Sequence, residues 1–121
     1  MSKHNPAIIE IKTLEDARKE IKNLGCDPNS IEIMAPKAVF KTILLENVHP
    51  TDAIILKQDM LSIGGEVAIP MDVFENKEKN CRILIMGTLR HFRELVDKLN
   101  RHYPRIKNIS NELENLLREE W

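Results

Sequence analysis

The apolar residues of this chain change between two spacings, and this alternation constrains the fold more than any other feature. Four segments repeat apolar residues every three or four positions, which is typical of helices with one buried face. They are Leu14–Leu24, His49–Ile63, Thr88–Arg101 and a final helix marked by Ile109, Leu113 and Leu116. Shorter runs rich in β-branched and aliphatic residues favour strands. They are Ala7–Lys12, Ala38–Glu46, Glu66–Ile69 and Cys81–Gly87.

This order predicts a single α+β domain over residues 1–121, with a mixed α/β arrangement of about four to five strands in one sheet and about four helices. Because Ala38–Glu46 carries apolar residues on both faces, we expect it to be a central strand. Ile31–Met34 fits either a short strand or a helical turn, since Pro36 follows closely and restricts the backbone. The segment Asp72–Asn80 is predicted to be an exposed turn or hairpin.

Residues with helix-capping preferences define where two of the helices begin. Thr13 stands at the N-cap position of the first helix, with Asp16 three residues later in a variant of the capping box. Asp52 falls in the first turn of the second helix, where the helix dipole favours an anion. These positions predict stable helix starts at both places.

Net charge and cysteine content exclude several classes of protein. A net charge of −1 argues against a general polyanion binder, and no apolar run approaches the roughly 18 residues of a membrane span. Since the N-terminus lacks the apolar core of a signal peptide, we expect a cytoplasmic protein without a membrane partner. We expect Cys26 and Cys81 to be reduced thiols, with a disulfide between them as the alternative.

The sequence carries no known catalytic or metal-binding motif. It lacks GxSxG, HExxH and CxxC, and none of its four histidines pairs with another ligand at a metal-binding spacing. His91 and Glu94 share a helix face, but such a pair is common on exposed surfaces. We therefore expect no catalytic residue, no metal and no cofactor.

Glycine-bearing corners supply the candidate ligand-binding residues. Gly64 and Gly65 lie between a helix and a strand, and Gly87 and Thr88 precede a helix whose N-terminus can bind an anion. Each also has a structural explanation: Gly64 suits a left-handed helix cap, and Gly65 allows a tight corner. The full set of candidates is Lys37, Lys57, Gly64, Gly65, Gly87, Thr88 and Arg90.

The segment Gly87–Lys107 is basic, and the chain after it is acidic. Six basic residues face only Glu94 and Asp97: Arg90, Arg93, Lys98, Arg101, Arg105 and Lys107. Such neighbours indicate either intramolecular complementarity or a docking face. The segment offers no interleaved aromatic platform on which bases could stack, which argues against nucleic acid as the partner.

Three stretches resemble the N-terminal extension of the long dihydropteroate synthases of clostridia and related bacteria. They are IMAPKAVFK (Ile33–Lys41), ILKQDMLSIGGEVAI (Ile55–Ile69) and the segment from Ile83 to Leu117. The resemblance extends from about Ile8 to Leu117. The chain departs from the family at HYPRI (His102–Ile106), where members tend to have a QPFGL-like stretch.

The resemblance implies a non-catalytic accessory domain linked to folate or related pterin biosynthesis. Its partner would be a synthase-type barrel, with self-association as a further possibility, and the expected docking surface is the polar face of the Lys57 helix with the Arg90–Lys107 segment. The synthase active site is not implied, because the barrel motif MGILNVTPDSF is absent and a barrel needs about 250 residues. Binding of a pterin or a phosphate-containing molecule at the glycine corners, and RNA binding, are the alternatives.

Overall fold

The computed structural model describes residues 3–75 and 78–121, which contain one antiparallel sheet of three strands. The strands are β1 (Phe40–Val48), β2 (Glu66–Ala68) and β3 (Cys81–Thr88), in the spatial order β1-β3-β2. Ile85 in β3 lies opposite Ile43 of β1 and opposite Val67 of β2. The chain is therefore an α+β protein, as predicted.

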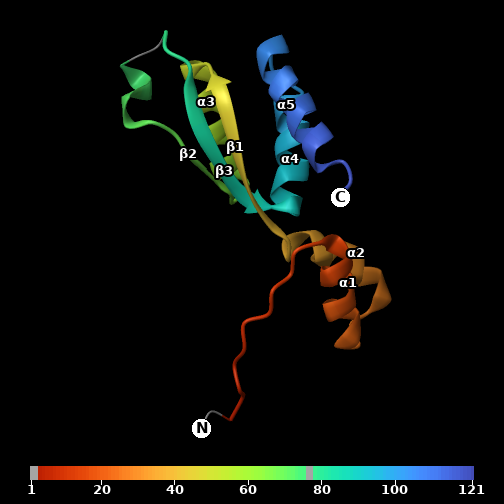
Figure 1. Cartoon of the computed structure of the whole chain (residues 1–121). Helices are drawn as coiled ribbons and strands as arrows, with labels where there is room; N and C mark the ends of the chain where they lie inside the picture. The colour runs from red at the N-terminus through yellow and green to blue at the C-terminus, as the bar shows by residue number, and fades with distance from the viewer. Residues whose placement is uncertain (1–2, 76–77) are drawn as a thin grey trace.

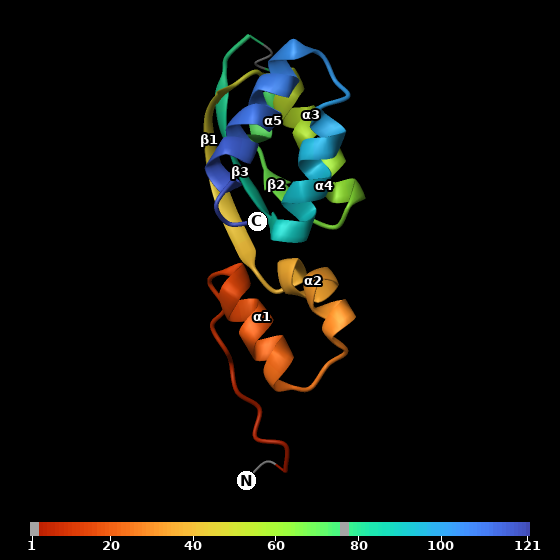
Figure 2. The same ribbon diagram turned by 90° about the vertical axis from the view of Figure 1, so that its right-hand side faces the viewer.

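Three helices pack on one face of this sheet. They are α3 (Pro50–Ser62), α4 (Leu89–Leu99) and α5 (Pro104–Leu117). Figure 2 shows β1 and β3 on one side of the molecule and these helices on the other. The buried side chains are mainly aliphatic and include Ile43, Leu56, Met60, Ile83, Ile85, Leu95 and Leu113, with Phe92 among them. The scarcity of aromatic residues therefore leaves the core to Ile, Leu, Val and Met.

A small helical unit precedes β1 and lies at the lower end of the sheet in Figure 1. It consists of α1 (Leu14–Asn23), α2 (Ile31–Met34) and the 3₁₀ turns η1 (Pro28–Ser30) and η2 (Ala35–Lys37). The predicted cap of α1 is confirmed, because the backbone N–H of Asp16 donates to Thr13 Oγ1 at 3.1 Å. Arg18 Nε and Glu32 Oε1, 2.8 Å apart, join α1 to α2. Of the two alternatives for Ile31–Met34, the helical one is correct.

The prediction of a strand at Ala7–Lys12 is wrong. This segment has no helix or strand, and the Ile8 side chain is 99% exposed. β-propensity mainly reflects how a side chain packs on a half-buried sheet surface, and this segment meets no neighbouring strand here. The sheet consequently has three strands among the described residues rather than four or five, and it is antiparallel rather than mixed.

The predicted central position of the strand at Ala38–Glu46 is also wrong, because β1 lies at an edge of the sheet. Its second apolar face is not covered by helices: Phe40 is 60% exposed and Leu44 is 49% exposed. Here, apolar residues on both faces of a strand indicate that one face of the sheet has no covering layer, and not that the strand is central.

The connection from β2 to β3 passes through a 3₁₀ turn, η3 (Met71–Phe74), at the predicted exposed turn. Residues 76–77 of the predicted turn lie outside the described residues. Cys81 and Cys26 both carry free thiols, and the Cys81 Sγ donates to the carbonyl oxygen of Val48 at 3.4 Å. Burial raises the pKa of the Cys81 thiol above its usual value.

Candidate functional site

The glycine corners converge on the buried side chain of Met60. Gly64 has φ = 101°, the left-handed conformation that favours glycine at the end of a helix. A Cβ atom on Gly65 would lie 2.7 Å from Met60 Cε, and one on Gly87 would lie 2.5 Å from the same atom. Gly64 is therefore required by its backbone conformation, whereas Gly65 and Gly87 are required by the space that Met60 occupies.

The polar groups at these corners are bonded within the chain. Thr88 caps α4, since its hydroxyl accepts from the His91 N–H at 3.2 Å and its own N–H donates to His91 Nδ1 at 3.0 Å. Arg90 Nε donates to Glu94 Oε1 at 2.8 Å. These bonds use groups that a bound anion would otherwise engage at the start of α4.

Lys57 and Lys37 differ in their surroundings. The Lys57 ammonium donates to Glu66 Oε1 at 3.0 Å and to the carbonyl oxygen of Val67 at 2.7 Å. Lys37 lies exposed in η2, away from the glycine corners in sequence and on a different element. The structure thus places Gly65 and Gly87 against one methionine and Gly64 next to His91, and ligand binding by the seven candidates remains a prediction.

Asp52 forms a buried ion pair that sequence reasoning missed. It is 1% exposed in the first turn of α3, and Arg105 at the start of α5 donates to it through Nε at 2.5 Å and through Nη2 at 2.9 Å. The Tyr103 hydroxyl also donates to Asp52. Burial alone would raise the pKa of Asp52, but the hydrogen bonds from Arg105 and Tyr103 outweigh it and lower that pKa. The carboxylate joins α3 to α5.

Both partners of Asp52 lie in His102–Ile106, where the chain departs from the synthase family. The signal available in the sequence was the acidic residue in the first turn of α3. Its partners are 51 and 53 residues further along the chain, so no local spacing connects them.

An open hollow of about 380 Å³ separates the end of β1 from α5 next to this ion pair. Its lining is mainly polar and includes Asn47, His49, Asp52, Asn80, Arg105 and Glu112. Asn47 adopts φ = 54° where the register between β1 and β3 shifts. Both Asp52 oxygens already accept hydrogen bonds, so this hollow does not present a free carboxylate from Asp52.

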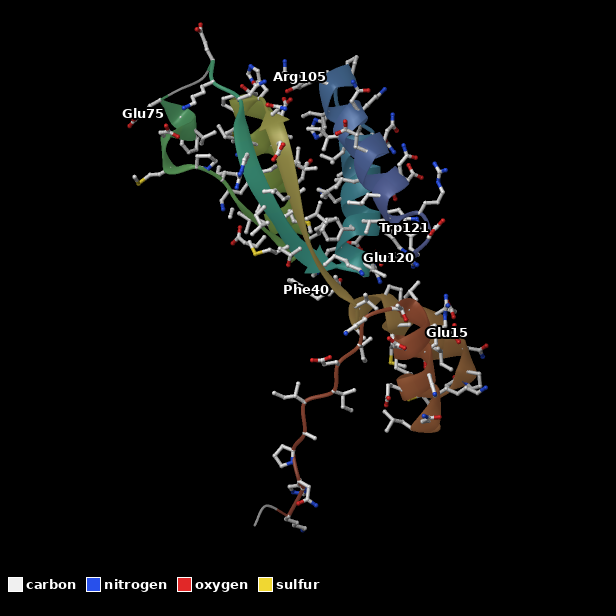
Figure 3. All side chains as sticks on the ribbon, viewed as in Figure 1. Glu15, Phe40, Glu75, Arg105, Glu120 and Trp121 are labelled. Carbon is white, nitrogen blue, oxygen red and sulfur yellow. The ribbon has the colours of Figure 1, made fainter. Side chains whose placement is uncertain are left out.

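The face of the sheet opposite the helices is open and apolar along its middle. Side chains alternate along β1, which exposes Phe40, Thr42, Leu44 and Glu46 on this face. Their cross-strand neighbours Met86 and Leu84 are half-buried, and Ala68 of β2 is exposed beside them. Figure 3 shows Phe40 at the lower end of the sheet, close to the helical unit. We call the surface formed by seven residues of the three strands the open face: Phe40, Thr42, Leu44, Glu66, Ala68, Leu84 and Met86.

The outer edge of β2 is closed by two side chains. Glu66 Oε1 accepts from the backbone N–H of Val67 at 2.9 Å, while the Lys57 ammonium donates to the Val67 carbonyl oxygen. The N–H and C=O of Val67 therefore point away from β3 and already have partners. Main-chain groups of this kind are what an exposed edge strand offers to another chain.

The outer edge of β1 has no such closure. In an antiparallel ladder, hydrogen-bonded and non-hydrogen-bonded pairs alternate. Since Val67 and Ile85 form a non-bonded pair, the register directs the main-chain groups of Thr42 and Leu44 away from β3. Within residues 3–75 and 78–121, no hydrogen bond reaches these groups. The lower half of β1 therefore presents an unpaired edge beside the open face.

Neither a metal site nor a membrane-crossing helix is found in the part of the chain that the structure describes. No three His, Cys, Asp or Glu side chains there are grouped to hold a metal ion. No helix there has both the length and the apolar character needed to cross a bilayer. Comparison of the chain with protein-family models, with curated proteins and with solved structures finds no match.

Proposed function

We propose that this chain is a non-catalytic interaction domain that docks onto a synthase-type barrel in folate or related pterin biosynthesis. The partner class rests on the resemblance of Ile33–Lys41, Ile55–Ile69 and Ile83–Leu117 to the extension of long dihydropteroate synthases. The docking role rests on the open face, which is the single observation that carries the proposal.

The composition of the open face suits a protein partner. An apolar centre of Phe40, Leu44, Leu84 and Met86 is bordered by the charged side chains of Glu46, Glu66 and Arg82. An apolar centre with a polar rim is the usual anatomy of a protein interface. The outer helices of a barrel would supply the layer that this sheet lacks on one side.

The sheet is a better docking surface than the one expected from charge. Arg90 is paired with Glu94, Arg105 with Asp52, and Arg93 Nη2 donates to the carbonyl oxygen of Trp121 at 3.0 Å. Much of the basic segment is thus engaged inside the chain. These ion pairs and this hydrogen bond would have to break before the basic side chains could bind a partner.

Analytical ultracentrifugation of the full chain with a clostridial long-type dihydropteroate synthase barrel tests the proposal. We expect a complex that is lost in Phe40→Glu and Ala68→Glu, which place a charge on the open face without removing a buried side chain. Leu116→Glu is the matched control, because Leu116 is 62% exposed on α5, and it should bind as the wild type does. No complex with both proteins at about 100 μM, or equal loss in all three variants, would reject the proposal.

A further inference from the structure

Residues 3–10 form an arm that projects away from the body. In Figure 1 the arm runs down beside the helical unit and extends past its lower end, and residues 6–10 make no helix or strand. Ile8 is 99% exposed and Ile9 is 61% exposed, and as neighbours in an extended strand these two β-branched side chains would lie on opposite faces. Isolated exposed apolar residues need no explanation, but an extended apolar segment with unpaired main-chain groups is suited to strand addition.

The lower half of β1 has the complementary features. The main-chain groups of Thr42 and Leu44 have no partner among the described residues. An added strand there would meet apolar side chains on both faces: Leu44 on the open face, and Ile43 with Leu45 on the face toward the helices. Ile8 and Ile9 point to opposite faces of an extended arm, so each finds an apolar neighbour. This match explains why an edge strand is apolar on both faces.

We propose that residues 7–11 of one copy of this chain add as a fourth, antiparallel strand to the outer edge of β1 in a second copy, in a reciprocal exchange. Five extended residues span about 17 Å, which matches the five residues of β1 from Lys41 to Leu45. Because the exchange is reciprocal, it is two-fold symmetric and ends at a dimer in which both arms and both open edges are used. The outer edge of β2 does not compete for the arm, since Glu66 and Lys57 already bond to the main-chain N–H and C=O of Val67.

The base of the arm directs it toward another molecule. Ile11 is half-buried against the core, and the N–H of Lys12 donates to Asp16 Oδ2 at 3.4 Å. The Lys41 ammonium, 3.5 Å from the Lys12 carbonyl oxygen, contacts the same point from β1. With Lys12 held in this way, the preceding residues leave in the direction away from their own sheet. Reaching their own β1 would require the chain to reverse at Ile11.

The oligomeric state of the full chain tests this exchange. Sedimentation equilibrium between about 1 and 300 μM should show a dimer that Ile9→Asp converts to a monomer, because a charge would enter the added strand. The Ile9 side chain is 61% exposed and lies outside the hydrophobic core of the single chain, so this variant should retain the wild-type circular dichroism. Leu24→Asp is the matched control: Leu24 is 81% exposed at the end of α1, and its variant should remain dimeric.

A second variant tests the edge itself. Thr42→Pro removes one outward-pointing N–H from β1 while keeping the ladder with β3, since proline is tolerated on the free side of an edge strand. We expect it to be monomeric and folded. Hydrogen exchange at the Leu44 amide should be at least tenfold slower in the wild-type dimer than in Ile9→Asp.

Three results would overturn the exchange. A wild type that stays monomeric with a fast-exchanging Leu44 amide has no strand on this edge. A monomer in which the Leu44 amide is protected from exchange would mean that the arm pairs with β1 of its own chain. A dimer that survives Ile9→Asp uses another surface. None of these outcomes bears on binding to the barrel, which is tested on Phe40 and Ala68.

Discussion

The β2 side and the β1 side of the sheet differ in how completely the chain satisfies its own groups. On the β2 side, the Met60 side chain fills the space left by Gly65 and Gly87, and Lys57 and Glu66 close the edge. On the β1 side, an edge is unpaired, Leu44 is half exposed, and a polar hollow separates the strand from α5. The difference teaches that this fold closes one edge of its sheet with its own side chains and, within the described residues, leaves the main-chain groups of the other edge unpaired.

The largest effect is expected from Met60→Ala, which breaks the packing of the β2 side. Met60 is fully buried between two glycines, and its truncation leaves a cavity that backbone atoms cannot easily fill. The free energy of unfolding should fall by about 3 kcal/mol in urea denaturation. Leu61→Ala is the control on the same helix, where 48% exposure limits the loss to below about 1 kcal/mol. Equal losses in both variants would mean that Met60 does not fill the glycine corners.

A smaller effect is expected from Asp52→Asn, which weakens the connection between α3 and α5 on the β1 side. At neutral pH we expect a loss of about 1–2 kcal/mol, below the usual value for a broken buried pair because the Arg105 side chain is 50% exposed. Glu112→Gln is the control: Glu112 lies exposed in the lining of the same hollow, and its variant should match the wild type.

The loss in Asp52→Asn should depend on pH with a defined sign. Because the pKa of Asp52 is lower in the folded chain, its contribution is complete above the unfolded pKa of about 3.9 and disappears as pH falls through the folded value. Urea denaturation of wild type and variant between pH 7 and 2.5 should therefore converge at the acid end. A difference that grows as pH falls would contradict the ion pair.

Glu66→Ala sharpens the comparison of the two edges directly. Removing the carboxylate leaves the Val67 N–H without its 2.9 Å acceptor, and the β2 edge then resembles the β1 edge. The Val67 amide should exchange about tenfold faster, while stability changes by less than about 1 kcal/mol because the Lys57–Glu66 pair is partly exposed to solvent. Glu75→Ala serves as control on the β2–β3 connection. An unchanged Val67 amide would show that Glu66 does not close this edge.

The smallest effect is expected at Asn47, where β1 leaves its regular register. The left-handed backbone at this position disfavours most side chains by about 1 kcal/mol, whereas glycine adopts it freely. Asn47→Ala should lower the melting temperature slightly and Asn47→Gly should not. If the alanine variant is the more stable, Asn47 does not adopt this conformation in solution.

The parts of the fold that depend on neighbours in sequence were predictable. Thr13 and Asp16 identified the start of α1, and Gly64 identified the corner after α3, because capping groups act over three or four residues. Non-local features were not predictable from spacing. Nothing near Asp52 indicates Tyr103 or Arg105 as its partners.

The order of the strands was also not predictable from the sequence, nor was the absence of a strand at Ala7–Lys12. The apolar residues of β1 have the same pattern in a central strand as in an edge strand whose outer face is uncovered. Ala7–Lys12 has the composition of a strand, but pairing depends on which edge it meets and in which copy. The candidate surface was missed for the same reason, since it exists only where β1, β2 and β3 come together.

Methyl NMR during titration with the barrel tests the central claim, that this domain acts through the uncovered side of its sheet, most directly. We predict that the methyl signals of Leu44, Leu84 and Met86 shift or broaden as the barrel is added, while those of Leu24 and Leu116 stay unchanged. Perturbation confined to Leu116 and other methyl groups of α4 and α5, with the sheet signals unaffected, would contradict the account.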